Sequence, residues 1–159
     1  MKTIKILIIV LNLFVGGFLV YGSISKFGET PKADKMIEQV KKGEEVAPNN
    51  EVLMIKNYIF GMKQTGYFWG FLGIAELLAG VLLVSQFFAR IGAIVALPIT
   101  LNIFLFHLFL ESHEINELVL MLLLLVSNMT LIALSYTSWK GLVFNTEAFQ
   151  FKKRIEVSN

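Results

Sequence analysis

The sequence predicts an all-α integral membrane protein, an antiparallel four-helix bundle with an amphipathic helical hairpin between its first and second spans. Three observations lead to this prediction. The chain of 159 residues is 55% hydrophobic and only 16% charged, whereas soluble domains are usually about a quarter charged. Its apolar residues are gathered into four blocks, each long enough to cross a bilayer. One long polar segment separates the first block from the other three.

The four predicted spans belong to a single membrane domain that covers residues 1–159, and they comprise residues 6–23, 67–88, 91–110 and 118–137. The first block follows the basic residues Lys2 and Lys5, as the core of a signal peptide would. However, it is about as long as a full span and the following V-Y-G-S is a poor cleavage site, so we expect this helix to be retained.

Residues 28–66 form the long polar segment between spans one and two. Thr30 and Pro31 are suited to begin a helix that ends before Gly43, and residues 51–62 place their apolar side chains on one side of a second helix. We expect the two helices to form a hairpin that lies on the bundle or at the membrane interface. The tail, residues 141–159, mixes aromatic with basic residues and is expected to lie against an anionic leaflet.

The distribution of basic residues predicts that both termini face the cytoplasm. The turn after span three has no Lys or Arg, the turn after span two has Arg90, and the tail is basic. The polar segment and Lys26 together hold seven lysines, and the opposite side of the membrane would also hold seven basic residues. The predicted orientation therefore depends on the short segments, where the positive-inside rule applies best.

The composition excludes several classes of function. The chain has no cysteine, which excludes disulfides, thiol redox chemistry and Fe–S clusters. Its net charge of +2 and the lack of a basic run with interleaved aromatics give no reason to expect a nucleic-acid partner. It contains neither a G-x-S-x-G motif nor a phosphate-binding loop, so we assign no catalytic residue and do not expect a stand-alone enzyme.

Each predicted span carries one strongly polar residue near its middle, and these residues are Asn12, Glu76, Asn102 and Asn128. Gly73 and Gly80 share a helix face with Glu76 and let another helix come close, as would Gly66 and Gly70 upstream. A carboxylate in hydrocarbon costs about 2.5–3.5 kcal/mol. Two interpretations follow: either the three asparagines hydrogen-bond Glu76 and set the register of the helices, or Glu76 serves a ligand, a proton or a quinone.

The acidic turn after span three is a second candidate region. His107 shares a helix face with Thr100 and Glu111, whereas Asn102 points away from it. A metal could be held by some of the residues His107, Glu111, His113, Glu114 and Glu117. Because these straddle a turn and match no fixed ligand spacing, a hydrogen-bonded structural histidine and a quinone or proton role for His107 stay open.

Four stretches of the chain form a set that can be compared with known families, and they are GFLVYGSISKF at 17–27, GIAELLAGVLL at 73–83, FFARIGAIVAL at 87–97 and LNIFLFHLFL at 101–110. In this order and context, they resemble the DoxX-like family of small four-helix membrane proteins. The resemblance covers the first three spans, whereas the fourth span and the tail match only in hydropathy. Gly73, Glu76, Gly80 and Arg90 stand on positions that recur in the family, which adds Arg90 to the ligand-binding candidates.

The resemblance implies a multi-pass protein of a bacterial-type cytoplasmic membrane. Family members have been linked to small subunits of quinol oxidases and of thiosulfate:quinone oxidoreductases, and remote relatives to chaperoning of other membrane proteins. We therefore expect a non-catalytic subunit or scaffold of a membrane redox complex, with a quinone or lipid site near Glu76. Its partners would be the lipid bilayer and another membrane protein or further copies of itself. The alternatives are an assembly protein with a purely structural polar layer and a carrier of small solutes or protons.

Overall fold

The computed structural model describes residues 2–27, 41–43 and 50–136. These residues form no strand, and their helices are α1 (Lys2–Phe27), α3 (Asn50–Gln64), α4 (Phe68–Val84), α5 (Ala89–Leu110) and α6 (Ile115–Leu134). The all-α prediction is confirmed for this part of the chain. Helices α1, α5 and α6 are long and apolar enough to cross a membrane. Helices α3 and α4 add a fourth such element only if they are taken together, and they meet at an angle of 92°.

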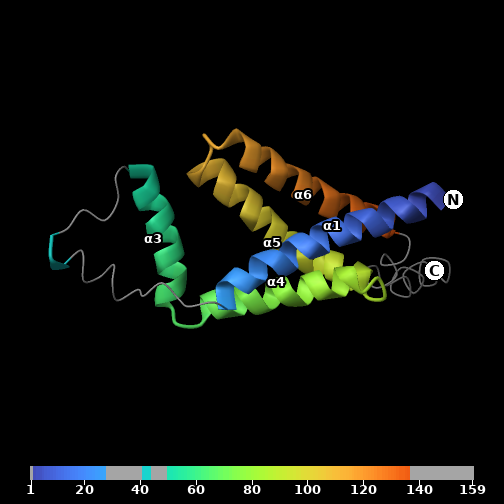
Figure 1. Cartoon of the computed structure of the whole chain (residues 1–159), viewed down its shortest axis with the longest axis horizontal. Helices are drawn as coiled ribbons and strands as arrows, with labels where there is room; N and C mark the ends of the chain where they lie inside the picture. The colour runs from blue at the N-terminus through green and yellow to red at the C-terminus, as the bar shows by residue number, and fades with distance from the viewer. Residues whose placement is uncertain (1, 28–40, 44–49, 137–159) are drawn as a thin grey trace, which may run out of the picture.

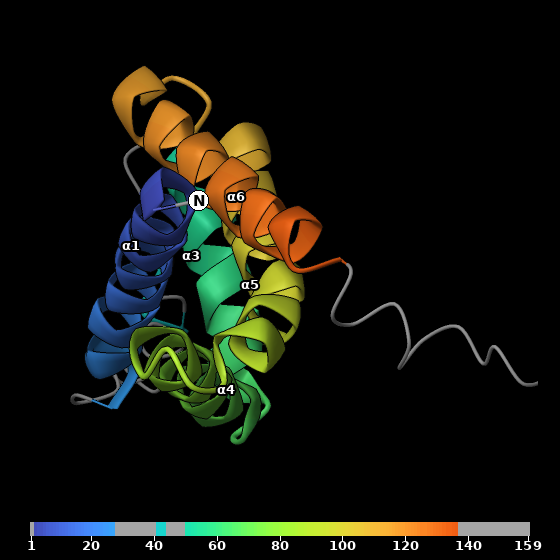
Figure 2. The same ribbon diagram turned by 90° about the vertical axis from the view of Figure 1, so that its right-hand side faces the viewer.

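Helices α1, α4, α5 and α6 pack together, and successive helices among these four run in opposite directions (Figure 1). Helix α1 lies against α4 and α5 lies against α6, while contacts of α4 with α5 and of α1 with α6 join the two pairs (Figure 2). The pairs diverge toward the turn between α5 and α6, and α3 crosses this open end (Figure 1). The start of α1 and the turn between α4 and α5 lie at the opposite end.

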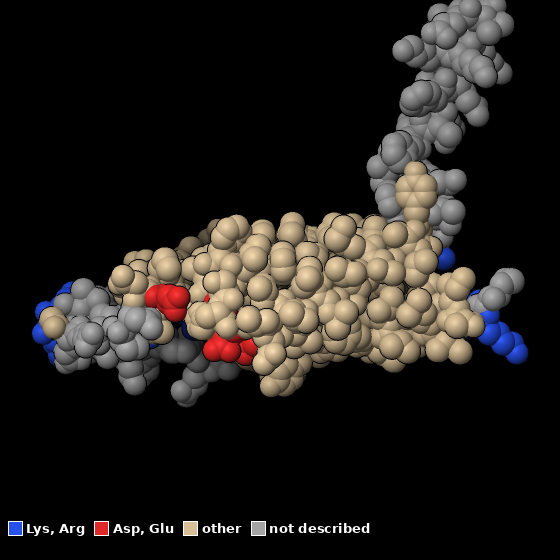
Figure 3. Space-filling model, turned by 90° about the horizontal axis from the view of Figure 1, so that it is seen from above, with Lys and Arg blue, Asp and Glu red and all other residues tan. Residues whose placement is uncertain are grey.

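The core lies where the four helices meet, and its side chains are all aliphatic or small. Its fully buried members include Val15, Leu19, Ala79, Leu83, Ala96 and Leu124. Large apolar side chains also cover the outer faces of the same four helices, where they are exposed. On the face shown in Figure 3, the visible charged side chains lie toward the two ends of the molecule, and the surface between them is apolar. In α1, no charged residue lies between Lys5 and Lys26, a stretch of about 30 Å at 1.5 Å per residue.

Helices α1 and α4 come closest at Gly16 and Gly80. A Cβ atom on Gly16 would lie 2.9 Å from the carbonyl oxygen of Gly80, and a Cβ atom on Gly80 would lie 2.8 Å from that of Gly16. At Gly73 a Cβ atom would lie 3.0 Å from the Cβ atom of Lys26. The prediction that Gly73 and Gly80 admit a neighbouring helix is confirmed, and the neighbour is α1.

The helix boundaries differ from the predicted ones in ways that affect the site. Helix α1 continues past residue 23 and so includes Lys26. Helix α4 ends at Val84 because Gln86, with a φ of 60°, turns the chain toward α5. Gly66, with a φ of 77°, forms the turn between α3 and α4, while Gly70 is exposed with no atom near its Cβ position, so neither takes part in the helix packing expected of it.

The second helix of the predicted hairpin is confirmed as α3, which begins and ends within two residues of the expected bounds. Most of the first hairpin helix, at residues 30–43, lies outside the described residues, as does the tail at residues 141–159. Helix α3 has no buried residue. Its position across the open end therefore depends on a few side-chain contacts with α4 and α5 rather than on a core of its own.

Gly16 and Gly17 are adjacent in α1 and allow a matched test of the packing. Gly16→Ala should lower the free energy of unfolding, because the new Cβ atom would lie 2.9 Å from the carbonyl oxygen of Gly80. Gly17→Ala meets no atom within 4 Å and should stabilise α1 by up to about 1 kcal/mol through helix propensity. Thermal unfolding in mild detergent measures both, and equal effects would contradict the close approach of α1 and α4.

Candidate ligand-binding site

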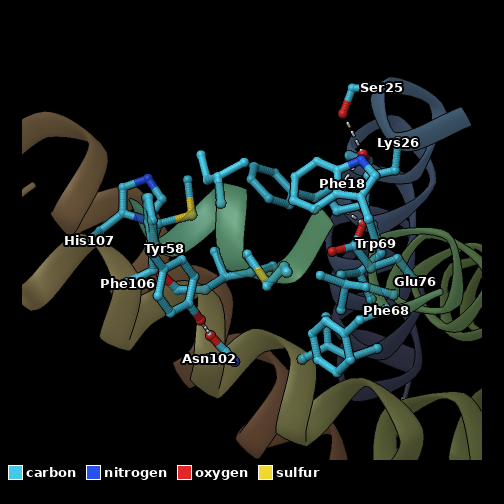
Figure 4. Close-up of a pocket in the computed structure, with 18 residues that line it drawn as sticks. Phe18, Ser25, Lys26, Tyr58, Phe68, Trp69, Glu76, Asn102, Phe106 and His107 are labelled. Carbon is cyan, nitrogen blue, oxygen red and sulfur yellow. Dashed lines mark hydrogen bonds and ion pairs between the residues drawn. The ribbon is translucent and has the colours of Figure 1, made fainter. Parts of the chain in front are cut away.

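A cavity of about 300 Å³ lies between the two diverging helix pairs, and α3 contributes to its wall (Figure 4). Most of its lining is apolar, with aromatic side chains that include Phe18, Phe68, Trp69 and Phe106. Lys26, Trp69 and Glu76 gather on one side of the cavity, and Tyr58, Asn102, Phe106 and His107 lie on the other (Figure 4). Small-molecule pockets usually measure about 300–1,000 Å³, so the cavity is large enough for a small ring-shaped group.

One polar side of the cavity consists of a buried ion pair. The Nζ atom of Lys26 lies 2.7 Å from Oε2 of Glu76, and the two side chains are 13% and 3% exposed. Lys26 stands in the last turn of α1 and reaches back to the middle of α4, where Gly73 leaves room for it. Its Nζ atom also donates to the carbonyl oxygen of Gly22 at 3.4 Å and lies 5.5 Å from the ring centroid of Trp69. The partner of Glu76 is therefore a cation.

The expected layer in which three asparagines hydrogen-bond Glu76 is wrong. Asn12 donates from Nδ2 to Oε1 of Gln86 at 3.0 Å, and Asn102 accepts at Oδ1 from the hydroxyl of Tyr58 at 3.0 Å. Asn128 bonds to Thr100 and to the backbone of α5. Spacing along a helix fixes the depth of a side chain, but the rotation of about 100° per residue decides which neighbour it faces.

Asn128 is fully buried between α6 and α5. With its amide turned so that nitrogen donates to the carbonyl oxygen of Ala93, its oxygen accepts from the Thr100 hydroxyl and the Leu97 amide, all at 3.1 Å. Ala93 and Leu97 stand one helical turn apart just before Pro98, whose ring disturbs the backbone hydrogen bonds of α5. Asn128 thus has a structural role in joining α5 to α6, independent of Glu76.

Asn12 and Arg90 lie away from this cavity. They line a separate cavity of about 220 Å³ near the turn between α4 and α5, together with Gln86. Arg90 is exposed at the start of α5. The two predicted ligand-binding candidates are therefore not brought together with Glu76, although Glu76, Asn102 and His107 do line one cavity.

His107 faces the acidic turn that follows α5. Its Nδ1 atom lies 2.9 Å from the carbonyl oxygen of Ile103. Its Nε2 atom lies 3.2 Å from Oε2 of Glu111 and 3.5 Å from Oε2 of Glu117. Three members of the predicted metal-binding set are thus brought together, with one potential ligand atom of each within 4.8 Å of the others.

The remaining two members, His113 and Glu114, form a separate exposed group. Nδ1 of His113 lies 3.6 Å from Oε2 of Glu51, and its Nε2 lies 4.0 Å from Oε1 of Glu114. Glu51 belongs to α3, and nothing in the sequence indicated that the start of this helix would come near the turn after α5. The five predicted ligands therefore divide into two groups.

Lys26 and Tyr58 are site residues that the sequence analysis missed. Lys26 was counted with the loop, because the predicted first span ended at residue 23. A signal was nevertheless present, since a carboxylate in hydrocarbon needs a compensating charge and Lys26 stands just beyond the end of a span. Trp69 also belongs to this side of the cavity, and the Nζ atoms of both Lys26 and Lys63 lie within 5.5 Å of its ring centroid.

The chain matches no protein-family model, and it shows no match to a curated protein or to a solved structure. The resemblance to the DoxX-like family thus stays a prediction. The described residues define an all-α protein with three long apolar helices and a cavity that contains a buried ion pair.

The ion pair can be tested with a double-mutant cycle. Lys26→Met should lower the free energy of unfolding by about 3 kcal/mol, because it leaves the Glu76 carboxylate buried without a partner. Lys26→Met combined with Glu76→Leu removes both charges and should recover most of that loss. The free energy of unfolding in mixed detergent micelles is measured for the wild-type protein, for Lys26→Met, for Glu76→Leu and for the double variant. Additive effects of the two substitutions would contradict a coupled buried pair.

Proposed function

We propose that the chain is a multi-pass integral membrane protein in which α1, α4, α5 and α6 are the four spans of an antiparallel bundle. The exposed apolar side chains, and the largely uncharged middle of the face shown in Figure 3, support this proposal. The hydrocarbon core of a bilayer is about 30 Å thick, which matches the uncharged stretch of α1. Helix α4 carries one charge, Glu76, and Lys26 compensates it. We place both termini on the cytoplasmic side of a bacterial-type cytoplasmic membrane, as the basic residues of the short segments favour.

We further propose that the cavity binds the head group of a quinone-class lipid. The observation that carries this proposal is the placing of polar groups on two opposite sides of an apolar, aromatic-lined space (Figure 4). A quinone ring has flat apolar faces and a carbonyl oxygen at each of two opposite ends, so it fits a cavity with hydrogen-bond donors on both sides.

Lys26 and Asn102 are the donors that we assign to the two carbonyl oxygens. The ammonium group of Lys26 has three N–H groups, and the contacts with Glu76 and Gly22 use two of them. Asn102 accepts from Tyr58 at its oxygen, which leaves its NH₂ group to donate. His107 is not a donor to the ring in this proposal, because its two nitrogens face Ile103 and the acidic side chains.

The energetics of the ion pair favour a ligand role over a purely structural one. Replacing a buried ion pair with apolar side chains of similar volume is often neutral or stabilising, so packing alone does not require Lys26 and Glu76. Within apolar surroundings, the pair holds a charged donor at one fixed position beside the cavity. Tyr58 and Asn102 are exposed, so the cavity is open on their side and a lipid could enter from the bilayer.

The role in the cell that we propose is that of a non-catalytic subunit or scaffold of a membrane redox complex, as the DoxX-like resemblance implies. Helix α3 favours a second candidate, an interaction or assembly protein. It has no buried residue, and its apolar side chains Leu53 and Met54 are 37% and 48% exposed at the open end. Such a surface is suited to contact another membrane protein.

The quinone proposal is tested by filling the cavity. Leu72 lines the cavity, whereas Leu78 of the same helix is 53% exposed on the outer face. Leu72→Trp should abolish binding of a short-chain benzoquinone and a short-chain naphthoquinone, and Leu78→Trp should leave it unchanged. Lys26→Met should weaken binding about tenfold, the worth of one hydrogen bond to a charged group.

Equilibrium binding in detergent, with the retained quinone measured by chromatography, gives these affinities. A wild-type protein that retains neither quinone would contradict the proposal, as would equal binding by the two tryptophan variants. Loss of co-purification with a membrane partner on Leu53→Asp and Met54→Asp, with quinone binding intact, would support the assembly role of α3.

A further inference from the structure

The contacts of His107 give its two ring nitrogens different surroundings. Its Nδ1 atom lies 2.9 Å from the carbonyl oxygen of Ile103, which can only accept a hydrogen bond, so Nδ1 is the donor of this contact. The Nε2 atom faces the Oε2 atoms of Glu111 and Glu117, at 3.2 Å and 3.5 Å. Two carboxylate oxygens that converge on one ring nitrogen favour a cation among the three atoms, which is either a proton on Nε2 or a metal ion.

We propose that this cation is a divalent transition-metal ion, bound by Nε2 of His107 and one carboxylate oxygen each of Glu111 and Glu117. Ligands at about 2.1 Å from a tetrahedral or octahedral ion are about 3.0–3.4 Å from their neighbours. The two distances from His107 Nε2 are close to this range, and all three ligand atoms lie within 4.8 Å of one another. Glu117 is 58% exposed, so a rotation of its side chain can bring its oxygen closer to an ion.

The identity of the ligands indicates the class of metal. An imidazole nitrogen suits zinc, iron and other transition ions, whereas magnesium and calcium prefer sites made of oxygen ligands alone. Two carboxylates and a neutral imidazole carry a charge of −2, which a divalent ion balances. Three protein ligands also leave coordination positions for water, as in open metal sites.

The chain holds the three ligands on two connected helices. His107 is in the last turn of α5 and Glu111 follows one turn later, while Glu117 is in the first turn of α6. The short turn between the helices places these two ends side by side (Figure 1). The contact of Nδ1 with the Ile103 carbonyl orients the imidazole from outside the ligand set, which is how ligand histidines are usually held.

The proposal assigns no ligand role to His113 and Glu114, although they lie in the same turn. His113 is 53% exposed, and its nitrogens face Glu51 and Glu114 rather than His107. Substitutions of His113 and Glu114 therefore serve as controls for substitutions of the proposed ligands. The metal proposal is also independent of the quinone proposal, since none of its three ligands is assigned to the quinone ring, and His107 lies on the opposite side of the cavity from Lys26 and Glu76 (Figure 4).

The experiment uses the purified full chain after chelator treatment, titrated with Zn²⁺ in the presence of excess Mg²⁺. Bound zinc is measured by mass spectrometry after equilibrium dialysis, and Co²⁺ substitution is followed by visible absorption. We expect one Zn²⁺ per chain. His107→Ala and Glu117→Gln should weaken binding at least tenfold, whereas His113→Ala and Glu114→Gln should leave it unchanged.

Glu117→Gln keeps the test valid if His107→Ala does not fold, because Glu117 is largely exposed and its replacement is nearly isosteric. Wild-type protein without stoichiometric zinc would overturn the proposal and leave His107 as a hydrogen-bonded structural residue. Equal loss of zinc from His107→Ala and His113→Ala would also overturn it. Leu72→Trp should bind zinc normally, so failure of the quinone proposal would be recognised separately.

Discussion

The ion pair between Lys26 and Glu76 is the constraint on which the arrangement of the open end depends. Either charge alone would be costly in an apolar environment, so the two side chains must meet. Their meeting requires that α1 continue to Lys26, that Gly73 leave room on α4, and that α1 and α4 pack closely along their length. The pair thereby fixes the register of α1 against α4 at the same end as the cavity.

The second helix pair, α5 and α6, is held together by hydrogen bonds of Asn128 rather than by an ion pair. The cavity lies between this pair and the pair of α1 and α4. Asn128 joins α6 to α5 on both sides of Pro98, through Ala93, Leu97 and Thr100, well before the acidic turn that follows α5. Each pair is therefore held internally, while the pairs themselves diverge toward the open end (Figure 1). Helix α3 has no buried residue and contributes Tyr58 to the cavity wall. The cavity thus lies where the two pairs, which contact each other through α4 with α5 and α1 with α6, diverge toward the open end (Figure 1).

The sequence predicted the helices well because hydropathy and helix length are local properties, and the described helices overlap all four predicted spans. It failed for the partner of Glu76, since depth in a span says little about the direction in which a side chain points. Asn12, Asn102 and Asn128 lie in helices, as expected, but their side chains bond to Gln86, Tyr58 and Thr100 rather than to Glu76. The missed residue, Lys26, depended on one extra turn of α1, and helix ends are the hardest feature to predict.

Charge balance separates the two polar centres of the cavity. On one side, Lys26 and Glu76 cancel, so the pair presents a hydrogen-bond donor with no net charge and suits an uncharged acceptor such as a carbonyl oxygen. On the other side, the carboxylates of Glu111 and Glu117 both face Nε2 of His107, so the proposed metal site is rich in acidic groups and suits a positive ion. Under the two proposals, the local charge therefore favours a different ligand at each centre. Removing a charge at one centre should therefore change the affinity for its own ligand, and leave the chemistry of the other unchanged.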